Sequence, residues 1–150
     1  MKVIVQKVKH ASVSHQEQSH SIEKGLLLFV GVREASTVED AKALAKKISN
    51  ARVFEDEHGK LNESVKNIDG EILSISQFTL YANVKKGNRP SFTEAAGKDH
   101  ALMLYEAFNE ALRDEGLDVS IGFFGEHMDV ELINDGPITL TYESEDGAIK

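Results

Sequence analysis

The sequence contains no cysteine, and this absence removes several kinds of site at once. A chain without thiols has no disulfide scaffold, no thiolate ligand for a metal ion and no cysteine nucleophile. Proline is also scarce, since only Pro90 and Pro137 occur in 150 residues. Each of them lies in a short motif rich in polar residues, so neither interrupts a long apolar segment.

Long hydrophobic runs are missing as well. The longest apolar segment, LLLFVGV at 26–32, is far shorter than the ~18 residues of a membrane-crossing helix and is typical of a buried strand. The first residues, MKVIVQKV, lack the apolar region and the small-residue cleavage site of a secretory signal. We therefore expect a cytoplasmic protein with no membrane partner.

Positive charge is in deficit. The formal net charge is −8, from 25 acidic and 17 basic residues. This balance argues against a protein that coats DNA or RNA without specificity, because such binding depends on many cationic contacts with phosphates. It leaves open the recognition of one RNA end by a local basic patch.

The remaining composition is that of an ordinary globular protein. Hydrophobic residues make up 41% of the chain and charged residues 28%. A chain of 150 residues buries a sizeable core within one domain, and no repeat or linker divides it. We therefore expect a single domain over residues 1–150.

β-branched residues and alternation with period two predict strands at both ends of the chain. Residues 2–14 are expected to form one strand, and 20–32 to continue as strand with a turn at 23–25. The segment 70–82 is expected to form a central strand. Further short strands are expected near 117–123, 128–133 and 138–143.

Two segments repeat their apolar residues at helical spacing. The first follows Ser36 and Glu39, which have the spacing of a capping box. The second covers about 94–115 and ends before Gly116, a fitting residue after a helix C-terminus. Together these patterns predict an α/β fold, in which a mixed β-sheet carries two main helices on one face and further strands on the other, in three layers α/β/β.

Six histidines raise the question of a metal site. His10, His15 and His20 lie five residues apart, and an odd spacing along a strand turns neighbours to opposite faces, so we expect no local convergence. No pair has the HxxxH or HExxH spacing that presents two ligands on one helical face. The segment FEDEHGKLNE (54–63) lacks the alternating ligands of a calcium loop and is typical of a solvated hairpin. We expect no functional metal.

The glycines do not form a phosphate-binding loop. Gly122, Gly125 and Gly136 are separated by strand-like residues and lack the strand, GxGxxG and helix context of such loops. Neither nucleotide hydrolysis nor dinucleotide redox chemistry is indicated, and we expect no cofactor.

The segment EILSISQFTLYANVKKGNRPSF, from residue 71, begins as a buried strand and then becomes polar. Ser76, Gln77 and Thr79 surround Phe78. These side chains either belong to a half-buried strand or line a pocket. Ser76 or Thr79 would need an activating base to act as a nucleophile, and no histidine or carboxylate lies in the same motif. A partner from a distant part of the sequence stays open.

A second polar motif, Asn134-Asp135-Gly136-Pro137, comes directly before a predicted strand. All four residue types form ordinary turns. Alternatively, a Gly-Pro tip presents two backbone carbonyls rigidly, because proline fixes φ and donates no N–H.

Taken together, these motifs resemble those of the D-aminoacyl-tRNA deacylases, also called D-tyrosyl-tRNA deacylases. SQFTL (76–80) resembles the family's SQFTL motif, and NDGPIT (134–139) resembles its NxGPVT motif. KGNRPSF (86–92) is similar to the KGxRPSF segment that follows the first motif. The similarity extends over essentially the whole chain.

The resemblance implies a homodimer with two active sites at the subunit interface. The Gly136-Pro137 tip of one subunit would enter the pocket of the other. The substrate implied is tRNA charged with a D-amino acid or with glycine, whose ester to the terminal adenosine is hydrolysed. L-aminoacyl-tRNA would be spared.

The resemblance also implies roles for the polar strand. Ser76 and Gln77 would hydrogen-bond the aminoacyl-adenosine, and Phe78 would shape the base or sugar subsite. Thr79 is either a nucleophile or a positioning residue. We favour positioning, because the terminal adenosine has its own 2′-OH beside the ester, and backbone N–H groups near Phe78 and Thr79 would stabilise the oxyanion.

The same resemblance implies a cis bond between Gly136 and Pro137, whose carbonyls would hold the substrate's amino group. An L side chain would then clash with the tip, whereas glycine has no side chain to reject. Lys85, Lys86 and Arg89, together with Lys98, would meet tRNA phosphates.

Three other functions stay open on the sequence. A small-molecule esterase using Ser76 or Thr79 would cleave generic activated esters without RNA. A non-catalytic module would bind an RNA end without releasing an amino acid, and a purely structural dimer would do neither. Assays with D- and L-tyrosyl-tRNA separate these functions.

Overall fold

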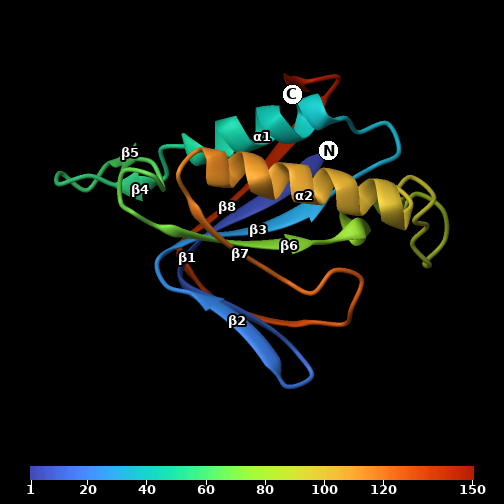
Figure 1. The fold of residues 1–150 in the computed structure, drawn as a ribbon, viewed down its shortest axis with the longest axis horizontal. Coiled ribbons are helices and arrows are strands. Elements are labelled where there is room, and N and C mark those ends of the chain that lie inside the picture. The colour runs from blue at the N-terminus through green and yellow to red at the C-terminus, as the bar shows by residue number, and fades with distance from the viewer.

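Strand β1 (Lys2–His15) lies within a seven-stranded sheet in the computed structural model, which describes residues 1–150 (Figure 1). The strands follow the order β7-β6-β3-β1-β8-β9, and β2 pairs with the second half of β1. β3, β6 and β7 run parallel, while β1 is antiparallel to β2, β3 and β8. The prediction of a mixed α/β sheet is therefore confirmed. The other strands are β2 (Gln18–Ile22), β3 (Gly25–Gly31), β6 (Glu71–Ser76), β7 (Asp118–Ile121), β8 (Asp129–Glu145) and β9 (Ala148–Ile149).

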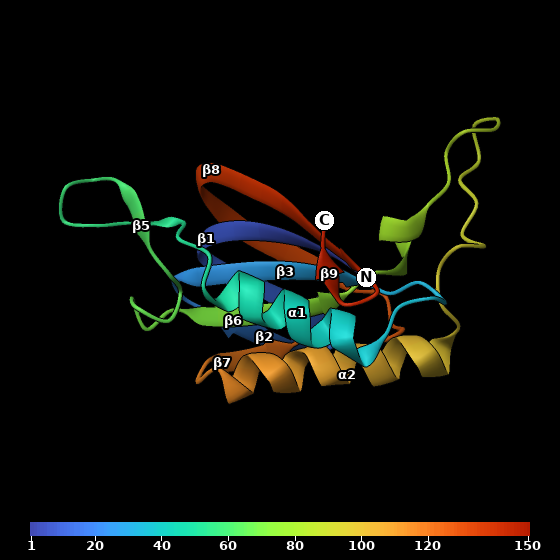
Figure 2. The same cartoon turned by 90° about the horizontal axis from the view of Figure 1, so that it is seen from above.

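Two helices, α1 (Val38–Ser49) and α2 (Lys98–Asp114), lie side by side over one face of the sheet (Figure 2). The face of β3 that carries Leu26 and Leu28 packs against them in a cluster of 21 buried residues. Leu44 of α1 and Phe108 of α2 belong to the same cluster. Neither helix is long and apolar enough to cross a membrane.

The opposite face of β3 and β6 has a core of its own. The second half of β1, together with β2 and the start of β8, curls away from the helices and covers this face (Figure 1). Strand alternation explains the division, because Leu27 and Leu73 point away from the helices that Leu26 and Ile72 contact. The seven members of this second cluster are Val8, Ala11, Val13, Ile22, Leu27, Leu73 and Ile75. The three-layer description of this arrangement stays a prediction.

The strand predicted over 70–82 is shorter than expected and is not central. β6 ends at Ser76, and residues Phe78–Tyr81 form a short 3₁₀ helix, η1. Its neighbour β3 ends at Gly31, so the last ladder bond runs from the Gln77 N–H to the Val30 carbonyl. A Cβ placed on Gly31 would lie 2.9 Å from the Cβ of Leu80, so the turn packs directly on this glycine.

The two strands predicted at 128–133 and 138–143 form one long strand, β8. Both parts pair with β1, in a register that shifts from Gln6 opposite Thr139 to Val8 opposite Asn134. The residues between 134 and 139 therefore bulge out of the ladder as a tip. The Gly136–Pro137 peptide bond in this tip is cis, as the resemblance implied.

The helix boundaries also differ from the predictions. α2 begins at Lys98 rather than at 94, because residues 82–97 form a long loop. The capping box of α1 is formed by Thr37 and Asp40, one residue later than predicted. β4 (Phe54–Glu55) and β5 (Leu61–Glu63) form the small hairpin expected around 54–63.

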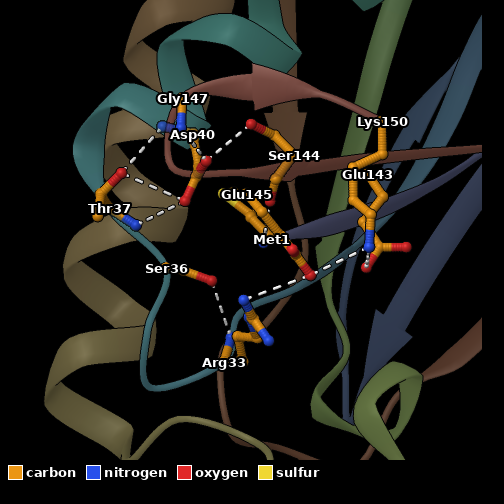
Figure 3. A network of polar contacts seen from close by, with 10 residues as sticks. All are labelled: Met1, Arg33, Ser36, Thr37, Asp40, Glu143, Ser144, Glu145, Gly147 and Lys150. Atoms are coloured by element: carbon orange, nitrogen blue, oxygen red, sulfur yellow. Dashed lines mark hydrogen bonds and ion pairs between the residues drawn. The ribbon is translucent and has the colours of Figure 1, made fainter.

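The first turn of α1 is bonded to the end of β8 (Figure 3). The Asp40 carboxylate accepts hydrogen bonds from the Thr37 N–H at 2.9 Å, the Ser144 hydroxyl at 2.7 Å and the Gly147 N–H at 2.8 Å. Burial alone would raise the pKa of Asp40, but these hydrogen bonds outweigh it and hold the pKa below its ordinary value. Asp40 therefore links two elements far apart in the sequence through its ionised form.

Candidate functional site

A pocket of about 590 Å³ opens where the parallel strands of the sheet end. The carboxyl ends of β3 and β6 meet at this edge, the usual place for a ligand site in sheets of this kind. One wall comes from the end of β6 and from η1, and the other from the start of α2 and the segment 124–130. The lining residues are Phe29, Ile75, Ser76, Gln77, Phe78, Thr79, Ala96, Lys98, Ala101, Phe124, Gly125, Glu126, His127, Met128 and Val130.

All four residues of the polar strand motif line this pocket. Ser76 is the last residue of β6, while Phe78 and Thr79 begin η1. The Gln77 side chain donates a hydrogen bond from Nε2 to the Thr79 hydroxyl at 2.8 Å. The Phe78 ring is 55% exposed and lies edge-on to Phe92, with ring centroids 5.0 Å apart. The end of the strand and the tight turn together explain why polar side chains gather here.

The hydroxyls of Ser76 and Thr79 have no neighbouring base. Neither hydroxyl hydrogen-bonds to a histidine or a carboxylate, and the only partner of the Thr79 hydroxyl is Gln77. His127 lines the pocket, but its ring is 92% exposed and lies 3.9 Å from Asp129. The site therefore has polar groups for binding and no preformed nucleophile–base pair.

The second wall of the pocket was not predicted from the sequence. Phe124 and Met128 contribute apolar surface, and Gly125 turns with a φ of 76°. A short stretch of phenylalanine, glycine and methionine carries no signal that separates a pocket wall from an ordinary core. Lys98, at the first turn of α2, is the one basic residue of the predicted group that lines the pocket.

The Gly136-Pro137 tip does not line the pocket of its own chain. It bulges from β8 opposite Lys7, and both residues of the tip are exposed. The Asn134 side chain spans the tip, accepting from the Ile138 N–H at 2.7 Å and donating to the Ile138 carbonyl at 3.1 Å. It also donates to the Thr139 hydroxyl at 3.0 Å. The tip is thus held in shape by one amide side chain.

A buried lysine lies beneath the tip. Lys7 is fully buried, and its ammonium group lies 2.7 Å from Glu55 of β4 and 3.9 Å from Asp135. The hydrogen bond from Lys7 holds the pKa of Glu55 below its ordinary value. The sequence pattern placed Lys7 within an alternating strand and gave no sign of this contact.

Three of the predicted basic residues lie away from the pocket. Lys85, Lys86 and Arg89 are exposed on the loop 82–97, which projects from the body of the molecule (Figure 2). All three side chains are exposed, so their charges face solvent. The loop extends from the same end of the sheet as the pocket, since η1 precedes it and α2 follows it.

Two histidines converge, contrary to the expectation from their spacing. His15 and His20 lie on neighbouring strands of the β1–β2 hairpin, where His20 is opposite Val13 and His15 is opposite Gln18. The turn between them cancels the odd spacing and places both on one face. Both imidazole rings contact the ring of Phe123. No group of three metal-binding side chains is formed.

Comparison with known proteins gives consistent matches. The family model described as D-Tyr-tRNA(Tyr) deacylase matches residues 4–143. D-aminoacyl-tRNA deacylases of Staphylococcus aureus strains bovine RF122 / ET3-1 and JH9 are each 55% identical over 150 residues, covering all of both chains.

Two solved structures have the same fold. The c-Myc DNA Unwinding Element Binding Protein has a TM-score of 0.89 and 40% identity, over 96% of this chain and 99% of that one. A probable eukaryotic D-amino acid tRNA deacylase has a TM-score of 0.82, over 95% of this chain and 98% of that one. At 17% identity, this second likeness concerns the fold alone.

Proposed function

The chain belongs to the D-Tyr-tRNA(Tyr) deacylase family, and on that premise we propose that it hydrolyses D-aminoacyl-tRNA in the cytoplasm, through one domain spanning residues 1–150. The observation that carries the proposal is the convergence of Ser76, Gln77, Phe78 and Thr79 on one pocket at the carboxyl edge of the sheet. The pocket combines polar side chains and apolar surface on both of its walls, which suits an aminoacylated nucleoside.

The proposed reaction is hydrolysis of the ester between the amino acid and the terminal ribose. Water attacks the carbonyl carbon, the bond from that carbon to the ribose oxygen breaks, and the ribose oxygen takes up a proton. Free D-amino acid and tRNA are the products. The backbone N–H groups of Phe78 and Thr79 stabilise the oxyanion, and Ser76 and Gln77 hold the substrate.

We assign Thr79 a positioning role. Its hydroxyl accepts a hydrogen bond from Gln77 and has no base to remove its proton. The 2′-OH next to the ester is the nearest group of the substrate that assists the attacking water. An ester needs less activation than an amide, so a site without a triad is sufficient.

We propose that the protein acts as a homodimer in which Gly136 and Pro137 complete the partner's pocket. This is supported by the position of the tip, which is exposed and does not line the pocket of its own chain. The tip carbonyls would hold the amino group, so that an L side chain clashes with the tip. Glycine on tRNA would be hydrolysed as well, because it has no side chain to reject.

We propose that the exposed cations of Lys85, Lys86 and Arg89 contact tRNA phosphates at the end of the sheet where the pocket opens. The net charge of the whole chain is −8, so the acidic remainder of the surface would restrict binding to this region, and we expect no affinity for DNA. Lys98 lies closer to the ligand and would meet the terminal phosphate.

The deciding experiment measures amino acid released from D-tyrosyl-, L-tyrosyl- and glycyl-tRNA by the purified protein. We expect rapid release of D-tyrosine and glycine and none of L-tyrosine above the rate without protein. Release from p-nitrophenyl acetate but not from tRNA would indicate a general esterase. Binding of tRNA without release would indicate a non-catalytic module, and either result would refute the proposal.

A further inference from the structure

The segment 122–128 is a thin wall between two hollows. On one side is the pocket of about 590 Å³, and on the other is a hollow of about 730 Å³ lined by the turn of the β1–β2 hairpin. Phe124 and Glu126 border both hollows. The position of this wall therefore depends on its contacts with the β1–β2 hairpin.

The wall has few hydrogen bonds of its own. The Gly122 N–H donates to the Ser74 carbonyl of β6 at 3.0 Å. Within the segment, the Glu126 N–H donates to the Phe123 carbonyl at 3.1 Å. The Phe123 N–H meets only the Met128 sulfur, at 3.2 Å. A segment bonded this sparsely needs external contacts to stay ordered.

Two histidines of the hairpin bind the two ends of the wall. His20 Nδ1 lies 2.6 Å from the Ile121 carbonyl, and His15 Nδ1 lies 2.8 Å from the His127 carbonyl. A carbonyl oxygen only accepts, so each imidazole carries hydrogen on Nδ1 and donates it. Between these two bonds, the Phe123 ring stacks on His20 at a centroid distance of 4.8 Å and lies tilted to His15 at 5.6 Å.

We propose that His15 and His20 are positioning residues that hold the segment 122–128 as one wall of the substrate pocket. Neither imidazole lines the pocket, so neither takes part in the chemistry. Both act through main-chain carbonyls and through Phe123, next to the pocket residue Phe124. The identity of the substrate rests on the proposed deacylase function. The contacts of His15 and His20 with the segment, which we call the clamp, rest on the geometry of the hairpin.

A kinetic signature distinguishes this role from a catalytic one. Ser76 and Thr79 are held by β6 and η1 on the opposite wall, so the reacting groups stay in place when the clamp is lost. Binding would weaken because Phe124 and Met128 no longer hold one position. A rise in KM with little change in kcat is the expected pattern for a contact made equally in the ground and transition states.

The experiment compares three variants with wild type on D-tyrosyl-tRNA. H15L/H20L removes both donors, whereas H15N/H20N keeps an N–H near the place of each Nδ1. His58→Leu, an exposed histidine of the distant β4–β5 hairpin, is the matched control. We expect H15L/H20L to raise KM about tenfold, the loss that one or two ordinary hydrogen bonds produce, and kcat to change less than about twofold. H15N/H20N should recover most of the KM.

Hydrogen–deuterium exchange supplies a readout that does not depend on activity. Amides of 121–128 should exchange faster in H15L/H20L than in wild type, H15N/H20N or His58→Leu, while those of β6 stay protected. A folded H15L/H20L with unchanged exchange and unchanged KM would overturn the proposal, as would a fall in kcat alone. If H15L/H20L does not fold, the single variant His20→Leu, at an exposed position, decides by the same two measurements. If wild type released no amino acid, the proposed function would fail. The exchange data would still show whether His15 and His20 hold the segment in place.

Discussion

The two hydroxyls of the pocket, on Ser76 and Thr79, differ from those of conventional serine and threonine hydrolases in their partners. Thr79 receives a hydrogen bond from Gln77, and neither hydroxyl has a histidine or carboxylate to take its proton. Each is therefore suited to orient a ligand, and in the proposed reaction the attacking oxygen comes from water.

Thr79→Ala and Ser76→Ala are expected to keep deacylation of D-tyrosyl-tRNA within about tenfold of wild type, because removal of a true nucleophile costs several orders of magnitude. A tRNA that ends in 2′-deoxyadenosine should not be hydrolysed. Single-turnover rates for each variant and each tRNA test both statements. A folded Thr79→Ala that binds tRNA but is inactive would establish covalent catalysis instead.

Asn134 is the residue that holds the tip, through hydrogen bonds to Ile138 and Thr139. Asn134→Ala should let the tip move, and the ratio of D- to L-tyrosyl-tRNA hydrolysis should fall at least about tenfold, since two or three hydrogen bonds are lost. Asn50→Ala, at the exposed end of α1, is the control and should leave the ratio unchanged. An unchanged ratio in Asn134→Ala would show that the preference for D-tyrosyl-tRNA does not depend on the shape of the tip.

Single residues also show which parts of the candidate site could be predicted from sequence patterns and which could not. The polar pattern around Ser76 left both a half-buried strand and a pocket open, and only the resemblance to the deacylases implied the pocket that these side chains line. The convergence of His15 and His20 was missed because alternation along one strand says nothing about a hairpin partner across a turn. Lys7 was missed because its burial depends on Glu55, which comes from a separate hairpin.

At the scale of elements, strand and helix identities followed from periodicity, whereas their ends depended on neighbours. β6 ends at Ser76 because β3 ends beside it. The sequence of either segment alone does not predict where the pairing stops. The two predicted strands of β8 are one because β1 pairs with both. The start of α1 was misplaced by one residue because Ser36 and Thr37 are both acceptable caps.

The link between α1 and β8 through Asp40 predicts a pH dependence of stability. Because the folded pKa of Asp40 is lowered, its contribution is present above the ordinary value of about 3.9 and is lost as the pH falls through the folded value. Asp40→Asn should lower the free energy of unfolding by about 2 kcal/mol at pH 7, as expected for hydrogen bonds to a charged group.

Urea unfolding of wild type and Asp40→Asn, measured from pH 7 to pH 2.5, tests this link. The difference between the two proteins should be constant above about pH 5 and should shrink below pH 4. Glu39→Gln, an exposed change in the same helical turn, should alter the free energy by less than about 0.5 kcal/mol. A difference that does not vary with pH would mean that the charge of Asp40 is not what stabilises the contact.

At the scale of the whole molecule, the free side of β8 is the surface most suited to a second copy. Ile133 is 49% exposed and Leu140 is 37% exposed, on a strand whose other side pairs only with the short β9. Unpaired strand edges with apolar side chains commonly associate. The tip lies in the same strand, so pairing here would bring it close to another chain.

We therefore predict a dimer whose specific activity falls on dilution below its dissociation constant, because in the proposed dimer each pocket needs its partner's tip. Sedimentation equilibrium and deacylation assays over the same concentrations test this prediction. A monomer with full activity and full preference for D-tyrosyl-tRNA would contradict it.

Mixed dimers offer a stricter test of the shared site. Ala101→Trp should block the pocket that Ala101 lines, and Asn134→Ala should leave an active but less selective protein. Adding excess Ala101→Trp to Asn134→Ala should restore selectivity, because the open pocket then receives an intact tip from its partner. If each tip served its own chain, mixing would leave the ratio of D to L hydrolysis unchanged.

The pairing of β1 with β8 has a consequence for how the protein is made. β1 ends at His15 and β8 begins at Asp129, so the strand that completes the sheet leaves the ribosome long after β1. Until then β1 has one open side, and the curl that covers Leu27 and Leu73 is incomplete. Contacts between such distant segments slow folding. The layer that covers Leu27 and Leu73 is therefore completed only after β8 has been synthesised, and until then the nascent chain exposes the open side of β1.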